Sequence, residues 1–541
     1  MFELVARGAR IALFFVGALA LPVSVSGQPV SASGTGGPQA PQAAGSGVVK
    51  KLSVDEAVQL ALEQNLDLQV QRVNPRVQEL NIQTARTAWT PNFTSGLSNS
   101  NATNSNYNRY AASGSTLTTD RLQWSFGANQ QLPWGGNYDV SWGSGRTKTN
   151  NAFDFTNPVL GSNITASYTQ SLMRNFSIDG ARQQLLISRK NREISDMQLR
   201  QTVLATIRNV KSAYWNLSYA VASLAVQQQT LDLARESLKN SEARVKVGTL
   251  APMDVIQSQA EVASREESVI RAQATVAQTE DQFRALIMDP QTPGFWDMKF
   301  ELSDAPAFQA QVVDVDAAVR KALDVRTDLT QQRKTIEEND ITLRYMRNQT
   351  LPDVNVQASY SMNATGGTTY NYDDSGNFLG ITKIGYGSVL NSLLRRDLPT
   401  WSFMLRVNYP IGKSSAEASL ASARLQYEQA KTQLRSAELG VTAEVRNAAR
   451  NVTTNQKRVE STRTARELQE RKLEAEQKKF AAGMSTTFFV LQAQRDLATA
   501  RNAELQAILD YTRSVVDFET VQQAPTYGGS GGGVVISSGG Q

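Results

Sequence analysis

Apolar residues recur every seven positions along two long stretches of the chain. The first series consists of Val203, Val210, Leu217, Leu224, Leu231, Leu238 and Val245. It continues after a break with Val255, Val262, Val269, Val276 and Phe283. The second stretch repeats the spacing with Val445, Val452, Val459, Leu473 and Phe480. Sustained seven-residue spacing with charged residues in between is typical of coiled coils, so both stretches are predicted to form long, paired helices.

The first of these helices is too long for an ordinary globular domain. Residues 181–247 lack proline, and as one helix they would span ~100 Å. Gly248 and Gly483 end the two long segments and suit left-handed helix caps. The return helix over 254–288 covers only ~50 Å, but residues 66–88 add ~35 Å if the two stack end to end. We therefore expect antiparallel hairpins in which one long helix is matched by two shorter ones.

Between the helices the apolar period changes to two, which predicts half-apolar β-strands. The alternation is clearest from Trp401 to Tyr409 and from Asp353 to Tyr360. The first half of the chain shows it at 122–128, 138–142 and 164–168. Segments near ten residues with one apolar and one polar face fit the strands of a transmembrane barrel.

Aromatic residues on these strands are predicted to face lipid or to lie at its boundary. They are Trp124, Trp134, Trp142, Trp401 and Phe403. The polar, glycine-containing stretches 99–120 and 365–377 are expected to be exposed loops. Pro75 interrupts a helical pattern and predicts a local kink or a restart of the helix.

Most of the chain consists of an internal duplication. A shift of 261 positions aligns residues 54–100 with 315–361, where 14 of the 47 pairs are identical. Chance would give roughly three identities at ordinary amino-acid usage. A shift of 235 aligns Leu185 with Leu420 and continues to Phe283 and Phe518. The two shifts differ by 26, so the first β segment is longer by about one hairpin.

These patterns predict a fold that is mainly α with β: duplicated long antiparallel coiled-coil hairpins plus transmembrane strands. The expected boundaries are a signal peptide over 1–27, a disordered leader over 28–49, a first repeat over 50–314, a second repeat over 315–522 and a disordered tail over 523–541. Within the first repeat we expect helices at 53–90, a β segment at 91–174, a helical hairpin at 180–288 and a connecting segment at 289–314. Within the second we expect helices at 315–350, a β segment at 351–411 and a helical hairpin at 415–519.

The start of the chain resembles an export signal. Arg7 and Arg10 precede the apolar run 11–21, and small residues lead to Gly27, which is typical of a cleaved secretory signal. After cleavage there, 53 basic and 49 acidic residues would remain, a net charge of +4. That charge is too small to indicate nucleic-acid binding.

Cysteine and histidine are both absent from the chain. Disulfide scaffolds, Cys/His metal sites and nucleophile–histidine triads are therefore excluded. No catalytic residue, cofactor or metal site is predicted, and the protein is not expected to be an enzyme. A lipid anchor on an N-terminal cysteine is also excluded, so attachment to a membrane must come from the fold.

Four to six strands cannot close a barrel, because the smallest bacterial barrels have eight and open edges are not tolerated in lipid. The chain must therefore oligomerise. Three copies would give 12 strands from four strands each, or 18 if the inserted hairpin joins the barrel.

Three blocks of sequence resemble the repeated signatures of the TolC-like outer-membrane efflux proteins. They are LSVDEAVQLALEQN from Leu52, RVKVGTLAPMDVIQSQAEV from Arg244 and KKFAAGMSTTFFVLQAQRDLATA from Lys478, and the likeness extends from Leu52 to about Phe518. The resemblance implies a homotrimer with a β-barrel in the outer membrane and an α-helical barrel in the periplasm. It also implies a periplasmic adaptor (membrane fusion) protein and an inner-membrane transporter as partners, in an efflux or type I secretion system.

The resemblance assigns the two hairpin tips to the periplasmic entrance, where adaptors make contact. The tip residues are Gly248, Thr249, Leu250, Gly483, Met484 and Ser485. Asp254 matches a tip acid of some relatives, although an acid in a first helical turn also complements the helix dipole.

The second tip departs from the best-known family members, which carry acidic residues just after it and an arginine within it. Here the residues after the tip are Phe488, Phe489, Val490, Leu491 and Gln492, and Ser485 stands within it. These residues argue against an aspartate ring and an arginine-linked gate. We hypothesise that one of these phenylalanines forms an apolar constriction. The alternative is that both pack between neighbouring hairpins.

The sequence fits two other classes of protein less well. A trimeric adhesin-like surface protein would use the coiled coil as a stalk, but such stalks do not normally fold back as duplicated hairpins. An enzyme would need a nucleophile, metal or phosphate-binding signature. The sequence therefore favours a passive outer-membrane conduit, and it does not identify the cargo.

Overall fold

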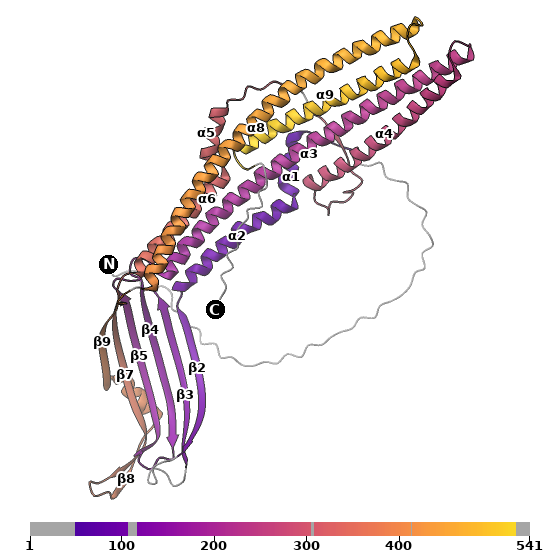
Figure 1. The fold of residues 1–541 in the computed structure, drawn as a ribbon. Coiled ribbons are helices and arrows are strands. Elements are labelled where there is room, and N and C mark those ends of the chain that lie inside the picture. Colours follow the sequence, from indigo (N-terminus) through magenta and orange to yellow (C-terminus); the bar gives the residue numbers. More distant parts are fainter. Residues whose placement is uncertain (1–48, 106–115, 305–307, 413, 526–541) are drawn as a thin grey trace, which may run out of the picture. The chain divides into compact units, whose positions relative to one another are not determined.

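Two segments of 67 residues form the longest helices of the computed structural model, which describes residues 49–105, 116–304, 308–412 and 414–525. They are α3 (Gly180–Lys246) and α8 (Ser415–Ala481). Each turns back into a helix of about half its length, α4 (Pro252–Ile287) or α9 (Thr487–Val521) (Figure 1). Helical hairpins therefore occupy both stretches in which the heptads lie.

Both long helices begin with a capping side chain. The carboxylate of Asp179 accepts a hydrogen bond from the backbone of Arg182 at 2.8 Å, and the hydroxyl of Ser414 accepts one from Glu417 at 3.2 Å. Each interaction satisfies a backbone donor of a first helical turn, which has no partner within the helix. Among the described helices, none is both long enough and apolar enough to cross a membrane.

Shorter helices complete a layer that is four helices wide. Near the tips, α4 contacts α3, α3 contacts α9, and α9 contacts α8. In the half nearer the sheet, α2 (Leu66–Arg86) and α6 (Thr327–Gln349) take the places of α4 and α9. The order is then α2, α3, α6 and α8, so one long helix is matched by two shorter ones in each repeat. Helix α2 continues through Pro75 as one helix, so of the two predicted alternatives, a kink or a restart, the restart does not occur.

Helix α2 follows α4 end to end along the layer, and α6 follows α9 in the same way. A hydrogen bond joins the two helices at equivalent positions in the two repeats. In the first, the Asn65 amide donates to the carbonyl of Leu286 at 3.0 Å. In the second, the Arg326 guanidinium donates to the carbonyl of Val521 at 3.2 Å. The shifts of 261 and 235 residues relate these pairs, so the duplication extends to the joints between helices.

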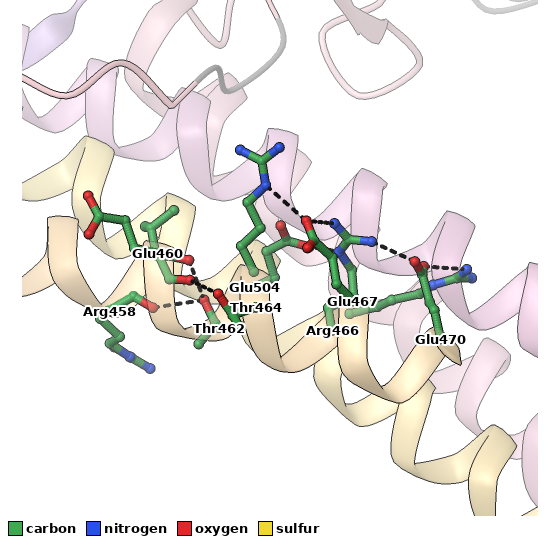
Figure 2. A network of polar contacts seen from close by, with 11 residues as sticks. Arg458, Glu460, Thr462, Thr464, Arg466, Glu467, Glu470 and Glu504 are labelled. Atoms are coloured by element: carbon green, nitrogen blue, oxygen red, sulfur yellow. Dashed lines mark hydrogen bonds and ion pairs between the residues drawn. The ribbon is translucent and has the colours of Figure 1, made fainter. Parts of the chain in front are cut away.

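Charged side chains tie α8 to α9 between the junction and the tip. Arg466 contacts Glu504 of α9 at 2.6 Å and Glu470 on its own helix at 2.8 Å (Figure 2). Arg501 of α9 reaches the other oxygen of Glu470 at 3.1 Å and the side chain of Gln229 on α3 at 2.9 Å. Burial alone would raise the pKa of Glu470, but the hydrogen bonds from Arg501 and Arg466 lower it.

Smaller elements pack against the helices halfway along the layer. They are α1 (Val54–Gln64), α5 (Val315–Val325) and the parallel pair β1 (Val49–Leu52) and β6 (Lys299–Leu302). Tyr214 and Phe283 are fully buried in the core that contains α1, β1 and β6, with ring centroids 5.9 Å apart. Helix α5 packs in a second core with α8 and α9. Strand β1 begins at the last residue of the predicted leader; the rest of that leader and the signal peptide lie outside the described residues.

The described strands at the other end form one antiparallel sheet. They are β2 (Asn92–Ser105), β3 (Thr116–Gln131), β4 (Gly136–Thr149), β5 (Thr156–Ser171), β7 (Asp353–Tyr372), β8 (Phe378–Ile384) and β9 (Leu398–Asn408). The order is β2-β3-β4-β5-β7, after which β9 pairs with the first half of β7 and β8 with its second half. Strand β2 forms one edge, and β9 together with β8 forms the other; β2 and β9 are exposed along their whole length.

Strands extend into both stretches that were expected to be loops. Residues 99–105 and 116–120 belong to β2 and β3, and residues 365–372 belong to β7. Their serine, threonine and asparagine side chains hide the strand pattern, because both faces are polar at this end. Residues 106–115 lie outside the described part of the chain.

A short helix that the sequence did not indicate lies across the sheet. It is α7 (Tyr386–Arg395), between β8 and β9. Val389 and Leu393 on its inner side are buried against Ala364 of β7.

Near the end of the described residues, Ala524 is fully buried and the backbone carbonyl of Gln523 accepts a hydrogen bond from the backbone of Thr327 at 3.0 Å. The predicted disordered tail therefore begins too early, at least for these residues.

Candidate functional site: two helical tips and a two-sided sheet

The two hairpin tips are built in the same way. Gly248 has φ +79° and Gly483 has φ +77°, a left-handed conformation that side chains with a Cβ rarely adopt. The Thr249 N–H bonds to the Arg244 carbonyl at 2.9 Å, and the equivalent Met484 bond is also 2.9 Å. Each glycine also donates to the carbonyl three residues before it. This is the Schellman arrangement, which caps both long helices.

Most of the predicted tip residues are solvent-accessible. Both glycines, Thr249 and Met484 are exposed, and the Met484 side chain is 74% exposed. Leu250 is half-buried, as is Ser485, whose hydroxyl donates to Glu476 at 3.0 Å. An exposed rim on a rigid cap is a surface that a partner protein can reach.

One contact joins the hairpins close to their tips. The Arg244 guanidinium of α3 lies over the Phe480 ring of α8, 4.5 Å from its centroid. A cation over an aromatic face is attracted by the ring quadrupole. The two tips of one chain are therefore held side by side.

The candidate gate residues occupy the first turns of the return helices. Asp254 is half-buried on α4, and its carbonyl accepts a hydrogen bond from Ser258 at 2.9 Å. Phe488 and Phe489 are each 53% exposed, and their ring centroids are 5.6 Å apart. Their neighbour Val490 is buried in the hairpin core instead. The structure thus leaves both phenylalanines available to a surface outside this chain.

A charged cluster that the sequence did not indicate links the two return helices. Glu261 of α4 is 5% exposed, and its carboxylate accepts two hydrogen bonds from the Arg495 guanidinium of α9, at 2.5 and 2.9 Å. Arg265, one turn further along α4, contacts its other oxygen at 2.7 Å. Burial alone would raise the pKa of Glu261, but the two arginines outweigh it and lower the pKa. The only sequence signal is an acid next to the apolar heptad residue Val262.

The sheet has one apolar and one polar face. Cross-strand partners share a face, so the register places Phe126, Trp142, Ile164 and Met362 in one row on the apolar side. The opposite face carries hydroxyl, amide and glycine residues, and its hydroxyls bond across strands, as between Thr165 and Ser361 at 2.6 Å.

The aromatic residues predicted to meet lipid fall into two groups. Trp134, Trp401 and Phe403 are 56%, 76% and 65% exposed. Trp124 and Trp142 are half-buried near α7: the Trp124 ring lies 5.4 Å from that of Tyr386, and Trp142 packs on the cluster around Val389 and Leu393. Helix α7 therefore covers part of the apolar face.

The structure thus joins a sheet with one apolar and one polar face to long helical hairpins. The model of the outer membrane efflux protein family matches residues 137–287 and 318–521, more than half of the chain. The protein belongs to this family. It is therefore an outer-membrane channel of efflux systems.

Solved structures of such channels have the same fold. CusC superposes with a TM-score of 0.62 at 15% identity, over 87% of this chain and 92% of CusC. The CmeC outer membrane channel of Campylobacter jejuni gives 0.60 at 15%, over 87% and 85%. VceC of Vibrio cholerae gives 0.59 at 15%, over 88% and 97%. Among curated proteins, no sequence matches this chain significantly.

Proposed function

We propose that three copies of this chain assemble into a passive conduit from the periplasm to the exterior. The observation that carries this proposal is the pair of open strand edges. Strand β2 forms one edge of the sheet and β9 together with β8 forms the other, and every residue of β2 and β9 is exposed. Hydrocarbon does not tolerate unpaired backbone N–H and C=O groups, so a membrane-spanning sheet of this kind must close with its neighbours.

The helical layer supports the same assembly. Helix α2, at one edge of the layer, exposes Val70, Val73 and Leu80 by 64%, 50% and 58%. Their spacing of three and seven places them on one face of the helix. Helix α8, at the opposite edge, exposes Leu425 and Leu439 by 72% and 74%. An apolar stripe at each edge suits a head-to-tail contact that closes into a ring.

The conduit itself performs no catalysis in this proposal. An inner-membrane transporter supplies the energy, and a periplasmic adaptor joins it to the tips around Gly248 and Gly483. The matched Schellman caps support this assignment, since six such tips would surround the entrance of a trimer. The cargo would belong to an efflux or a type I secretion system.

The phenylalanines of the second tip are proposed to narrow the entrance. Single-channel conductance of the Phe488→Ala and Phe489→Ala variants tests this role in planar bilayers, with Met484→Ala as a matched change at the same tip. We expect a rise in conductance for at least one phenylalanine variant and none for the control. Unchanged conductance in both phenylalanine variants would show that they only pack between hairpins.

The conduit and the adhesin-like stalk make different predictions for the purified protein. Light scattering should give the mass of three chains, and liposomes containing the protein should swell in permeant sugars. Tip variants that open the entrance should speed the swelling. A trimer that never conducts, even with its tips altered, would favour the stalk.

A further inference from the structure

The hairpin formed by β2 and β3 is a full part of the sheet. Its two strands pair from Asn92 with Asn129 to Ser105 with Thr116 without a register shift. Strand β3 then pairs with β4 from Thr119 to Gln131, again without a shift. Both strands precede residue 137, where the family match begins, whereas β4, β5, β7 and β9 lie within the matched ranges. The described residues thus contain six long strands, and the family match covers four of them apart from Gly136.

We infer that three chains close an 18-stranded barrel, in which β9 of each copy pairs with β2 of the next, around a wide lumen without net charge. This inference rests on the proposed trimeric conduit and adds its width and the class of cargo it admits. The occupant of both open edges is a second copy of this chain.

Strand direction allows this closure. Strand β2 follows helix α2 and leaves the helical end of the sheet, whereas β9 returns to that end and leads into α8. The six long strands alternate in direction, so the first and the last are antiparallel. Placing β9 beside the β2 of a neighbour continues the antiparallel order all the way round.

The faces match across the same junction. Phe93 and Leu97 of β2 are 70% and 77% exposed and lie on the apolar face. Trp401, Phe403 and Leu405 of β9 lie on that face too and are 76%, 65% and 58% exposed. Pairing the two edges therefore gives a continuous apolar exterior and a continuous polar interior.

The polar face is nearly free of charge. On the six long strands, its charged residues are Arg121, Asp139, Asp353 and Arg406, two of each sign. The remaining positions are mostly serine, threonine, asparagine, glutamine and glycine, and none is aromatic. A lumen of this composition does not select its cargo by charge, so neutral, hydroxylated and zwitterionic molecules would pass as readily as ions.

Eighteen strands make a wide exit. With about 4.8 Å between strands and a tilt of about 40°, the backbone diameter is about 36 Å, against about 24 Å for 12 strands. After about 5 Å of side chain on each wall, the free width is about 26 Å instead of about 14 Å. Most side chains of the polar face are small, so they narrow the lumen by less than this allowance for side chains. The barrel itself would therefore admit wider molecules than a 12-stranded exit.

The absence of native cysteine makes cross-linking a clean test. We would pair Phe403→Cys on β9 with Phe93→Cys, Ser95→Cys or Leu97→Cys on β2, since the register between copies is free. At least one pair should give reducible, covalently linked trimers on oxidation. Within one chain these positions lie five strands apart, about 24 Å, which is too far for a disulfide.

A 12-stranded barrel would instead bring β9 beside β4 of the next copy. The matched pair Phe403→Cys with Val140→Cys should therefore stay unlinked if 18 strands close. Linking through Val140, or a trimeric mass without linking by any β2 pair, would overturn the inference. A monomeric mass would instead contradict the proposed trimer itself, so the two failures are distinguishable.

A second measurement addresses the lumen. Ser402→Cys lies on the polar face and Phe403→Cys on the apolar face of the same strand. With trimers in liposomes, a polymer-linked maleimide about 18 Å wide should label only Ser402→Cys, because it fits about 26 Å but not about 14 Å. Small cationic and anionic thiol reagents should react with it at rates within about threefold of each other. Exclusion of the polymer, or a charge preference above tenfold, would contradict a wide neutral exit.

Discussion

Replacing Glu261 by glutamine tests the link between the two return helices. The carboxylate is 5% exposed and holds Arg495 at 2.5 Å and Arg265 at 2.7 Å. Removing one member of a buried ion pair costs about 3 kcal/mol or more, and glutamine retains the size and one acceptor, so about 2 kcal/mol is expected. Arg495 is 47% exposed, so Arg495→Gln should cost less, about 1 kcal/mol.

Hydrogen exchange of the α4 and α9 amides measures this loss locally. A cost of about 2 kcal/mol corresponds to about 30-fold faster exchange near the link. Glu267→Gln is the matched control, because Glu267 pairs with Arg271 on the same helix but is 60% exposed. Exchange in Glu261→Gln within twofold of that control would refute the reasoning.

The same comparison has a predicted dependence on pH. The pKa of Glu261 is lowered in the folded protein. Its contribution to the free energy of unfolding is therefore fully present above the ordinary carboxyl pKa of about 4.3 and is lost as the pH falls through the folded value. The difference in stability between the wild type and Glu261→Gln should be largest near pH 7 and shrink in acid. A difference that grows as the pH falls from 7 to 4 would contradict this assignment.

Three further outcomes are expected. Gly248→Ala and Gly483→Ala should each cost about 1 kcal/mol, because alanine is strained at positive φ; equal thermal midpoints for variant and wild type would contradict the cap geometry. Arg326 is 2% exposed, so Arg326→Leu should cost about 3 kcal/mol of stability, whereas Asn65→Ala should cost about 1 kcal/mol. The thermal midpoint of helix loss should therefore fall further in Arg326→Leu, and equal shifts would refute the ranking. Trp401→Phe should reduce the fluorescence quenching by brominated lipid, and unchanged quenching would place Trp401 away from lipid.

The repeating signals of the sequence had the most predictive value. Heptad positions such as Val210, Leu217, Leu231, Val445 and Val452 are buried in the structure. They carry the signal because a long coiled coil repeats one local rule many times. Glycine after each long heptad run likewise indicated the two tips, since the cap needs a positive φ that few other residues adopt.

The features that the sequence missed depend on contacts between distant segments. Glu261 and Arg495 are 234 residues apart, and neither is unusual in its own helix. Helix α7 is only ten residues long, and its apolar residues Val389 and Leu393 are buried only because they pack on the sheet, a contact that the local sequence does not indicate. The far half of β2 is polar on both faces, so its strand period cannot be seen in the sequence.

The most direct test of the account is a three-dimensional map of the purified assembly. We expect three chains around one axis, with a closed barrel that continues into a helical tube and an unbroken path between them. We also expect β9 of each chain beside β2 of the next. A solid coiled-coil stalk without a path, or sheets whose edges stay open in the membrane region, would contradict the account.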